Sequence, residues 1–128
     1  MKPAPPFTSE HTVLGHGIYL AAVALVLFLA PGTIRLFVAF PAEFDWWNRV
    51  LALPVFNLGI LCIGSAWAKS QLLIKLSVAT RLLVVSSLAV LVALRAVPLV
   101  ALGIGVIDLA SATLTLWALA AEARIRIP

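Results

Sequence analysis

Long uncharged stretches separated by short polar breaks form the pattern of this chain. A bilayer core of about 30 Å requires roughly 20 apolar residues in a helix that rises about 1.5 Å per residue. Four stretches meet this length, and two of them are interrupted by a single charge, Arg81 or Asp108. The pattern therefore predicts an all-α membrane protein with four transmembrane helices, over about residues 12–31, 48–68, 76–95 and 97–121.

The connections predict how these helices lie in space. The breaks after the second and third helices are only a few residues long, so helices 2, 3 and 4 are expected to be antiparallel neighbours, as in an up-down bundle. The first connection is longer, and its segment 33–40 (TIRLFVAF) is too short to span, so we expect it to lie in the membrane interface. We interpret residues 1–128 as a single membrane domain with a loose, proline-rich tail over 1–10.

Composition supports a lipid environment. The chain is 63% hydrophobic and 11% charged, whereas a soluble domain carries about 25% charged residues. The net charge is +4, but the nine Lys and Arg residues are scattered singly, which favours a lipid bilayer over nucleic acid as the partner. Cys62 is the only cysteine, and no metal or cofactor motif is present, so we predict neither and assign no catalytic residue.

Lys and Arg placement predicts the orientation, because cytoplasmic loops carry an excess of these residues. The side that holds both termini and the second loop carries five, namely Lys2, Lys69, Lys75, Arg124 and Arg126. The opposite side carries three, namely Arg35, Arg49 and Arg95. This difference favours both termini in the cytoplasm.

Four tryptophans lie near the predicted span ends. Indole rings are enriched at both membrane surfaces, where their apolar body and polar N–H are both accommodated. We therefore expect them to act as interface anchors, with one surface marked by Trp46 and Trp47 and the other by Trp67 and Trp117.

Two charges inside the spans need an explanation. Placing Arg or Asp at a helix centre costs roughly 2.5–3.5 kcal/mol of membrane-insertion free energy, so a partner for each charge would lower this cost. If the last turn is centred near Ala96, then Arg81 and Asp108 are offset by about three residues, or roughly 4.5 Å along the axis. Their side chains lean apart, however, because each points toward the start of its own helix. Arg81 therefore either reaches Asp108 or extends to the interface, and both alternatives stay open.

Small residues predict which helix faces are internal, because they let helices approach closely in lipid. In the fourth helix such a seam contains Asp108 and consists of Ala101, Gly105, Asp108, Ala112 and Thr115. In the second helix a comparable stripe consists of Asn57, Leu61, Gly64 and Ala68. We therefore predict a buried polar centre of Arg81, Asp108 and Asn57. His16 and Tyr19 lie at a similar depth to Arg81 and are predicted to line a possible pocket.

The polar centre has a structural and a functional interpretation. It either fixes helix register and partner choice, or it binds a ligand or proton, since ionisable residues within a membrane are often functional. Our first hypothesis is an accessory or interaction protein that packs against itself, as a homo-oligomer, or against a larger membrane complex. The alternative is a transporter or channel subunit that uses Asp108 and Arg81. A quinone- or lipid-handling enzyme subunit ranks lowest, because the sequence offers no redox centre.

Several motifs resemble a family. They follow in the order P-G-T-I-R-L-F after the first helix, W-W-N-R before the second, S-V-A-T-R in the third and I-D-L-A-S-A-T-L-T-L-W-A-L in the fourth. Over residues 15–121 the chain resembles small bacterial four-span proteins that are DoxX-like in size and topology. The resemblance implies this fold and a location in the bacterial inner membrane, and it implies no activity.

Overall fold

The computed structural model describes residues 8–37 and 45–126 of the 128-residue chain, and this part consists of helices and turns without strands. The elements in chain order are α1 (Ser9–Leu29), η1 (Pro31–Leu36), α2 (Asp45–Trp67), α3 (Gln71–Ala93), η3 (Leu99–Ala101) and α4 (Leu102–Arg126), where η marks a 3-10 helix. Each of the four α-helices is long and apolar enough to cross a membrane. The predicted all-α fold with four transmembrane helices is confirmed, and the chain is a multi-pass membrane protein.

Helix α3 begins at Gln71, five residues before the predicted start at 76. Ser70 causes the early start, because its hydroxyl caps the helix by accepting a hydrogen bond from the Leu73 backbone N–H (3.4 Å). Arg81 consequently lies ten residues, or about 15 Å, from the start of its helix. The charge therefore lies five residues farther from the start of its helix than the predicted span would place it.

Helix α4 begins at Leu102, five residues after the predicted start at 97, and it ends at Arg126 rather than near 121. The chain reverses through Arg95, which has a positive φ of 55°. It then passes Pro98 and forms η3 before the α-helix starts. Pro98 would lie in the first turn of a helix over 97–121, and it lies instead in the connection.

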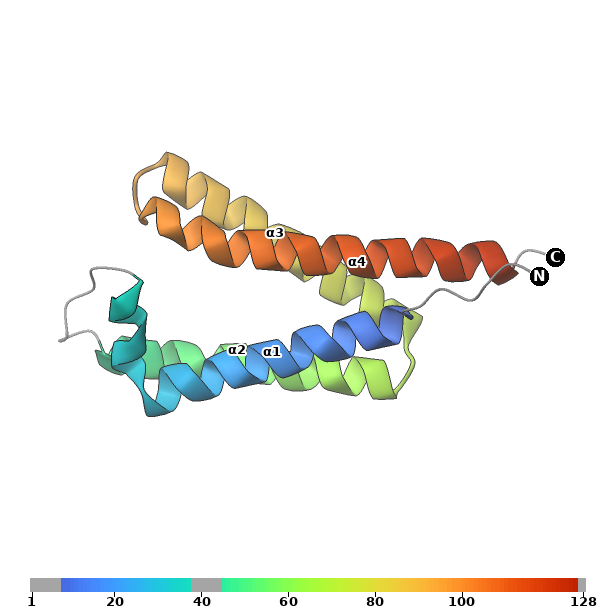
Figure 1. Ribbon diagram of the computed structural model, residues 1–128, viewed down its shortest axis with the longest axis horizontal. Coiled ribbons are helices and arrows are strands. Elements are labelled where there is room, and N and C mark those ends of the chain that lie inside the picture. The colour runs from blue at the N-terminus through green and yellow to red at the C-terminus, as the bar shows by residue number, and fades with distance from the viewer. Residues whose placement is uncertain (1–7, 38–44, 127–128) are drawn as a thin grey trace.

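The connection between α1 and α2 contains η1, which turns away from the axis of α1 in Figure 1. Two side-chain contacts tie it to α2. The Asn48 amide donates to the Pro31 carbonyl (3.1 Å), and Arg35 Nη2 lies 2.9 Å from Asp45 Oδ2. Part of the predicted interfacial segment, residues 38–40, lies outside the described residues, as does 1–7 of the predicted loose tail.

The first hairpin, α1 and α2, is held by contact between backbones. A Cβ added to Gly17 would lie 2.9 Å from the carbonyl oxygen of Gly59, and a Cβ added to Gly59 would lie 2.9 Å from the carbonyl oxygen of Gly17. Real Cβ contacts are longer than this, so only glycine fits at either position. The two helices therefore approach as closely as small residues allow in lipid.

The second hairpin, α3 and α4, has a looser glycine contact. A Cβ on Gly105 would meet only Leu88 Cδ1, at an ordinary 3.7 Å. Side-chain hydrogen bonds from Arg81 to the α4 hydroxyls of Ser111 and Thr115 join the two helices instead. The second hairpin is thus connected by polar side chains, whereas the first is connected by the main chain.

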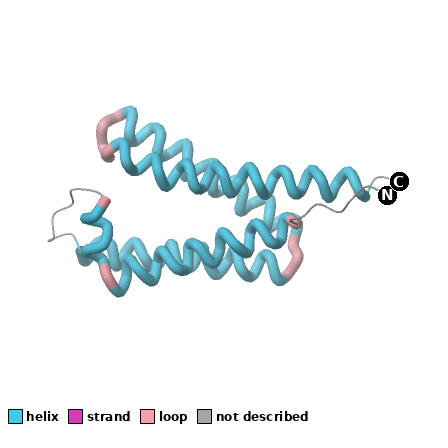
Figure 2. The backbone as a smooth tube through the Cα atoms, in the orientation of Figure 1, coloured by secondary structure: helices cyan, strands magenta, loops and turns pink. Residues whose placement is uncertain are grey.

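The two hairpins touch at one end and separate toward the other, as Figures 1 and 2 show. We call the end with Ser9, the turn at 68–70 and Arg126 the terminal end, and the end with η1 and the turn at 94–98 the loop end. The apolar core that spans both hairpins lies at the terminal end. It consists of Val13, Cys62 and Ile74, with Leu20 and Leu119 packed against it.

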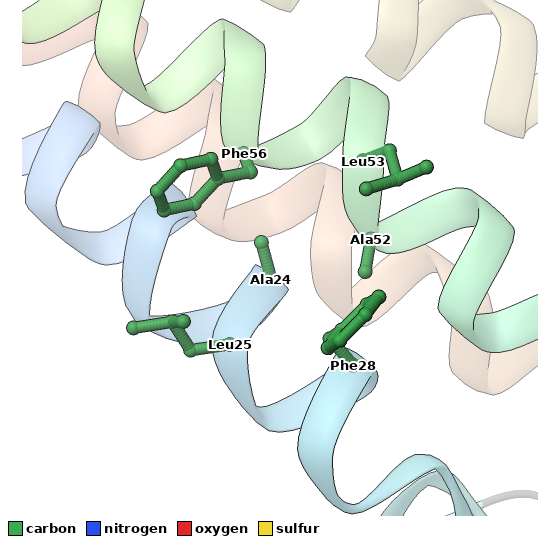
Figure 3. A pocket seen from close by; sticks show the side chains of 6 residues that line it. All are labelled: Ala24, Leu25, Phe28, Ala52, Leu53 and Phe56. Atoms are coloured by element: carbon green, nitrogen blue, oxygen red, sulfur yellow. The ribbon is translucent and has the colours of Figure 1, made fainter.

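Toward the loop end, the surface between α1 and α2 is apolar. A groove of about 190 Å³ between α1 and α2 is lined by Ala24, Leu25, Phe28, Ala52, Leu53 and Phe56 (Figure 3). Nothing in this lining donates or accepts a side-chain hydrogen bond. The groove therefore suits hydrocarbon.

Candidate functional site

A buried polar cluster lies between the hairpins near the middle of the spans. We use this name for the six side chains that α1, α3 and α4 contribute, namely His16, Ser77, Arg81, Asp108, Ser111 and Thr115. All are buried except Ser111, which is half-buried. The α4 members lie on the predicted seam or beside it, because Asp108, Ser111 and Thr115 recur every three to four residues.

Arg81 is 2% exposed and is bound by hydroxyl groups. Its Nη2 donates to Ser77 Oγ (2.9 Å), one turn earlier in α3. Its Nη1 donates to Thr115 Oγ1 (3.2 Å) and Ser111 Oγ (3.4 Å) of α4. The buried Nε has no hydrogen-bond partner. Burying a guanidinium is costly unless it is hydrogen-bonded, so these hydroxyls partly replace the lost water.

Neither alternative predicted for Arg81 is correct. The described residues contain two ion pairs within 4.0 Å, His16–Asp108 and Arg35–Asp45, so Arg81 does not pair with Asp108. It does not extend to the interface either, because it is almost fully buried. Side-chain direction explains the result: Arg81 leans toward the start of α3 and meets Ser111 and Thr115, whereas Asp108 leans the opposite way.

The partner of Asp108 is His16, which the sequence analysis did not foresee. Asp108 Oδ1 lies 3.6 Å from His16 Nε2, and the two residues are 6% and 5% exposed. The second ring nitrogen, Nδ1, lies 3.2 Å from Ser111 Oγ. One sequence signal pointed here: Asp108 and Ser111 are three residues apart on one face of α4, and His16 is the single histidine inside a predicted span.

Hydrogen bonding constrains the protons of this pair. Ser111 Oγ also lies 2.9 Å from the Asp108 carbonyl, one turn earlier in the helix, to which it donates. Its one proton is then used, so Ser111 must accept from Nδ1–H of His16 and from Arg81. Nε2 and Oδ1 are 3.6 Å apart, which is longer than a hydrogen bond, so the contact between them does not itself place a proton.

These contacts assemble a serine, a histidine and an aspartate that the sequence spacing did not connect. The set lacks two requirements of a hydrolase. The Ser111 hydroxyl donates to a backbone carbonyl rather than to the histidine, so it is not activated as a nucleophile. The backbone N–H groups around it belong to the interior of α4, where the helix uses them, so they cannot form an oxyanion hole. The arrangement is a hydrogen-bonded bridge between helices.

Asn57 does not belong to the polar cluster. It is exposed on α2, together with Leu61, Gly64 and Ala68 of the predicted stripe. The stripe that faces inward is a different one, consisting of Ala52, Gly59, Cys62 and Ala66. Both stripes have small residues at helical spacing, and the contact of Gly59 with Gly17 decides which one is internal. The prediction of Asn57 as a third member of the centre was wrong for this reason.

His16 and Tyr19 line one groove, as predicted, although Asn57 is not part of it. The groove has a volume of about 270 Å³ and lies between α1 and α4. Its polar lining consists of His11, Thr12, His16, Tyr19 and Ser111. The rings of His16 and Tyr19 are 5.9 Å apart and tilted by 39°. The groove thus reaches from the first turn of α1 to the buried polar cluster.

The four tryptophans are exposed, and three of them lie at helix ends. Trp46 and Trp47 follow the start of α2 with their rings 5.3 Å apart, and Trp67 is its last residue. Trp117 is exposed on α4, nine residues before the end of that helix. Their role as interface anchors stays a prediction. Within the part of the chain that the structure describes, no three metal-ligating side chains come together.

Comparison of the chain with protein-family models, curated proteins and solved structures finds no match. The resemblance to DoxX-like proteins therefore stays a prediction, and the function has to be inferred from the geometry.

Proposed function

We propose that this chain is a small integral membrane interaction protein that packs against itself or against a larger membrane complex. The observation that supports it best is the separation of the two hairpins. Each hairpin is closed internally, yet among the residues that the structure describes the apolar core common to both hairpins lies at the terminal end. A pair of membrane hairpins with so small a common core leaves broad helix faces available to other helices.

The buried polar cluster fits this function as the joint between the hairpins. It links α1 to α4 through His16, Asp108 and Ser111, and it links α3 to α4 through Arg81. Such hydrogen bonds are worth about 0.6–2 kcal/mol each in membrane bundles, and they are strongly directional. They fix how the hairpins are rotated relative to each other, and this rotation determines which faces a partner meets.

Native purification tests the proposal. The protein, extracted in a mild detergent and transferred to lipid nanodiscs, should be recovered as a defined oligomer or with a stoichiometric partner. Native mass spectrometry measures both. A homogeneous monomer without a partner, in the detergent and in the nanodiscs alike, would contradict an interaction function.

A second function, proton-linked transport as a channel or transporter subunit, is favoured by one observation. The groove from His11 and Thr12 reaches His16, whose Nε2 lies 3.6 Å from Asp108 Oδ1. Toward the loop end α1 offers no polar continuation of this groove, because its residues from Leu20 to Leu29 are all apolar. Along α1, protons therefore have a polar path to His16 from the terminal end alone. Asp108→Asn should abolish proton-driven uptake in reconstituted vesicles while the protein stays folded, and unchanged uptake would exclude this function for Asp108.

For the location, we propose the bacterial inner membrane with both termini in the cytoplasm. The resemblance to DoxX-like proteins supports the membrane, and the excess of Lys and Arg on the side of the termini supports the orientation. Cysteines introduced at Lys69 and at Arg95 on a Cys62→Ala background test it. An impermeant thiol reagent applied to intact cells should label position 95 and not position 69, and the reverse pattern would invert the topology.

A further inference from the structure

We infer that the outward face of α2 centred on Asn57 is the surface through which two copies of this chain associate. The inference rests on the proposed interaction function and names the partner as a second copy. Asn57 is exposed and lies twelve residues after the start of α2 and ten before its end. It is therefore at the middle of the span, about 15–18 Å from either helix end.

A carboxamide at this depth has no water to bind. A polar group in hydrocarbon without a partner costs several kcal/mol, which is why such groups face protein or a water-filled cavity. Within the described part of the chain, the Asn57 side chain makes no hydrogen bond. The lipid-facing hydroxyls of Ser86 and Thr113 differ, because each donates to a carbonyl one turn earlier in its own helix (2.9 and 2.8 Å). Asn57 thus requires a partner from outside the chain.

A second copy supplies such a partner at the same depth. Two copies inserted in the same direction are related by a two-fold axis along the membrane normal, which brings identical residues face to face. A carboxamide has both donors and an acceptor, so two Asn57 side chains can each donate to the other. The chemistry is self-complementary, whereas an unrelated helix would need a polar group at the matching height.

The surroundings of Asn57 permit close approach. Gly64, two turns further along the same face, has nothing within 4 Å of a Cβ built on it. The face therefore has open space in the single chain at the point where a second α2 would cross. A groove of about 440 Å³ between α2 and α3 adjoins it and includes Leu61 and Gly64 in its lining.

Self-association can be measured by energy transfer between labelled full-length copies in liposomes over a range of protein-to-lipid ratios. Asn57→Leu should weaken the dimer by about 3- to 30-fold, as expected for the loss of interhelical hydrogen bonds. Asn57→Gln keeps the carboxamide and should retain most of the affinity. Gly64→Leu should prevent the close approach of the two α2 helices. Gly103→Leu is the matched control, because a Cβ built on Gly103 also meets nothing within 4 Å, but Gly103 lies on α4.

Cross-linking gives an independent readout. On a Cys62→Ala background, Gly64→Cys should form a disulfide-linked dimer on mild oxidation, since two facing helices bring Cα atoms within the 4.4–6.8 Å that a disulfide needs, and Gly103→Cys should not. Equal affinity of wild type, Asn57→Leu and Gly64→Leu would overturn the inference while leaving self-association intact. A monomeric wild type that recovers a different protein would overturn it as well, and a monomer with no partner would overturn the proposed function itself.

Discussion

The two hairpins of this molecule achieve helix pairing in different ways. In α1–α2 the backbones touch at Gly17 and Gly59, where a Cβ on either residue would lie 2.9 Å from a carbonyl oxygen. In α3–α4 the corresponding glycine, Gly105, has an ordinary 3.7 Å contact, and the helices are joined by Arg81 and two hydroxyl groups. One interface depends on the absence of side chains, and the other depends on polar side chains.

The difference shows what each kind of contact provides in lipid. Hydrocarbon tails are as apolar as leucine, so apolar side chains alone give helices little reason to associate. Close backbone packing maximises dispersion contacts and tolerates no added atom. Polar contacts span a wider gap and act at a distance from the backbone, so the second hairpin can also bind His16 of the first. Substitutions should therefore affect the two hairpins with different size and sign.

The largest effect is expected in the first hairpin. Gly59→Leu places a side chain against the backbone of α1 and should lower the free energy of unfolding by about 3 kcal/mol or more. Denaturation by SDS in mixed micelles measures it. Gly103→Leu is the matched control, since it makes the same change in α4, where a Cβ meets nothing within 4 Å and the residue lies outside the proposed dimer surface. Similar destabilisation by both would contradict the backbone contact assigned to Gly59.

A second effect is expected where the hairpins meet at the terminal end. Glu122 of α4 accepts hydrogen bonds from the Ser9 backbone N–H (2.6 Å) and from Ser9 Oγ (3.0 Å) at the start of α1. Glu122→Ala removes both and should cost about 1–2 kcal/mol in the same denaturation experiment. The exposed Arg124, two residues further, is the control, and Arg124→Ala should be close to neutral.

A smaller effect on stability should distinguish His16 from Arg81 as the partner of Asp108. A double-mutant cycle with His16→Gln and Asp108→Asn should give a coupling energy of about 1 kcal/mol, because these side chains are 3.6 Å apart. The cycle with Arg81→Gln and Asp108→Asn should give a clearly smaller coupling, since the two groups form no ion pair within 4.0 Å. A larger coupling for Arg81 would restore the pairing considered from the sequence.

The smallest expected effect is a gain in stability rather than a loss. Gly105→Ala adds a methyl group at an ordinary contact distance from Leu88, and alanine is the better helix former by roughly 0.5–1 kcal/mol. We expect α3–α4 to tolerate it with a slight gain in stability, whereas Gly17→Ala in α1–α2 should destabilise. Thermal unfolding in one detergent compares the two variants directly, and destabilisation of equal size would remove the distinction between the hairpins.

The fold was predictable to a large degree because the signals for it are local. The length of an apolar stretch and its polar ends determine a span, and four spans were found from these alone. The ends of α3 and α4 were displaced by five residues, because Ser70 and the reversal through Arg95 set them through individual hydrogen bonds and one positive φ. Such features are weak signals among many serines and arginines.

The candidate site was predictable only in part. The seam that contains Asp108 was assigned correctly, because a charge and small residues share one face of α4. Asn57 was assigned to the wrong side of α2, since two small-residue stripes compete there and only the contact between Gly17 and Gly59 distinguishes them. His16 was recognised by its depth, but its pairing with Asp108 depends on how α1 and α4 are rotated.

The sequence by itself determined that this protein crosses a membrane four times and that Arg81 and Asp108 enter the apolar region, because hydropathy and helical rise are properties of each segment alone. The tertiary structure decided that Asp108 pairs with His16, that Arg81 is bound by hydroxyls, and that Asn57 faces outward. These outcomes depend on the rotation of each helix and on its register against its neighbours. Both are set by contacts between residues far apart in the chain, which no local pattern encodes.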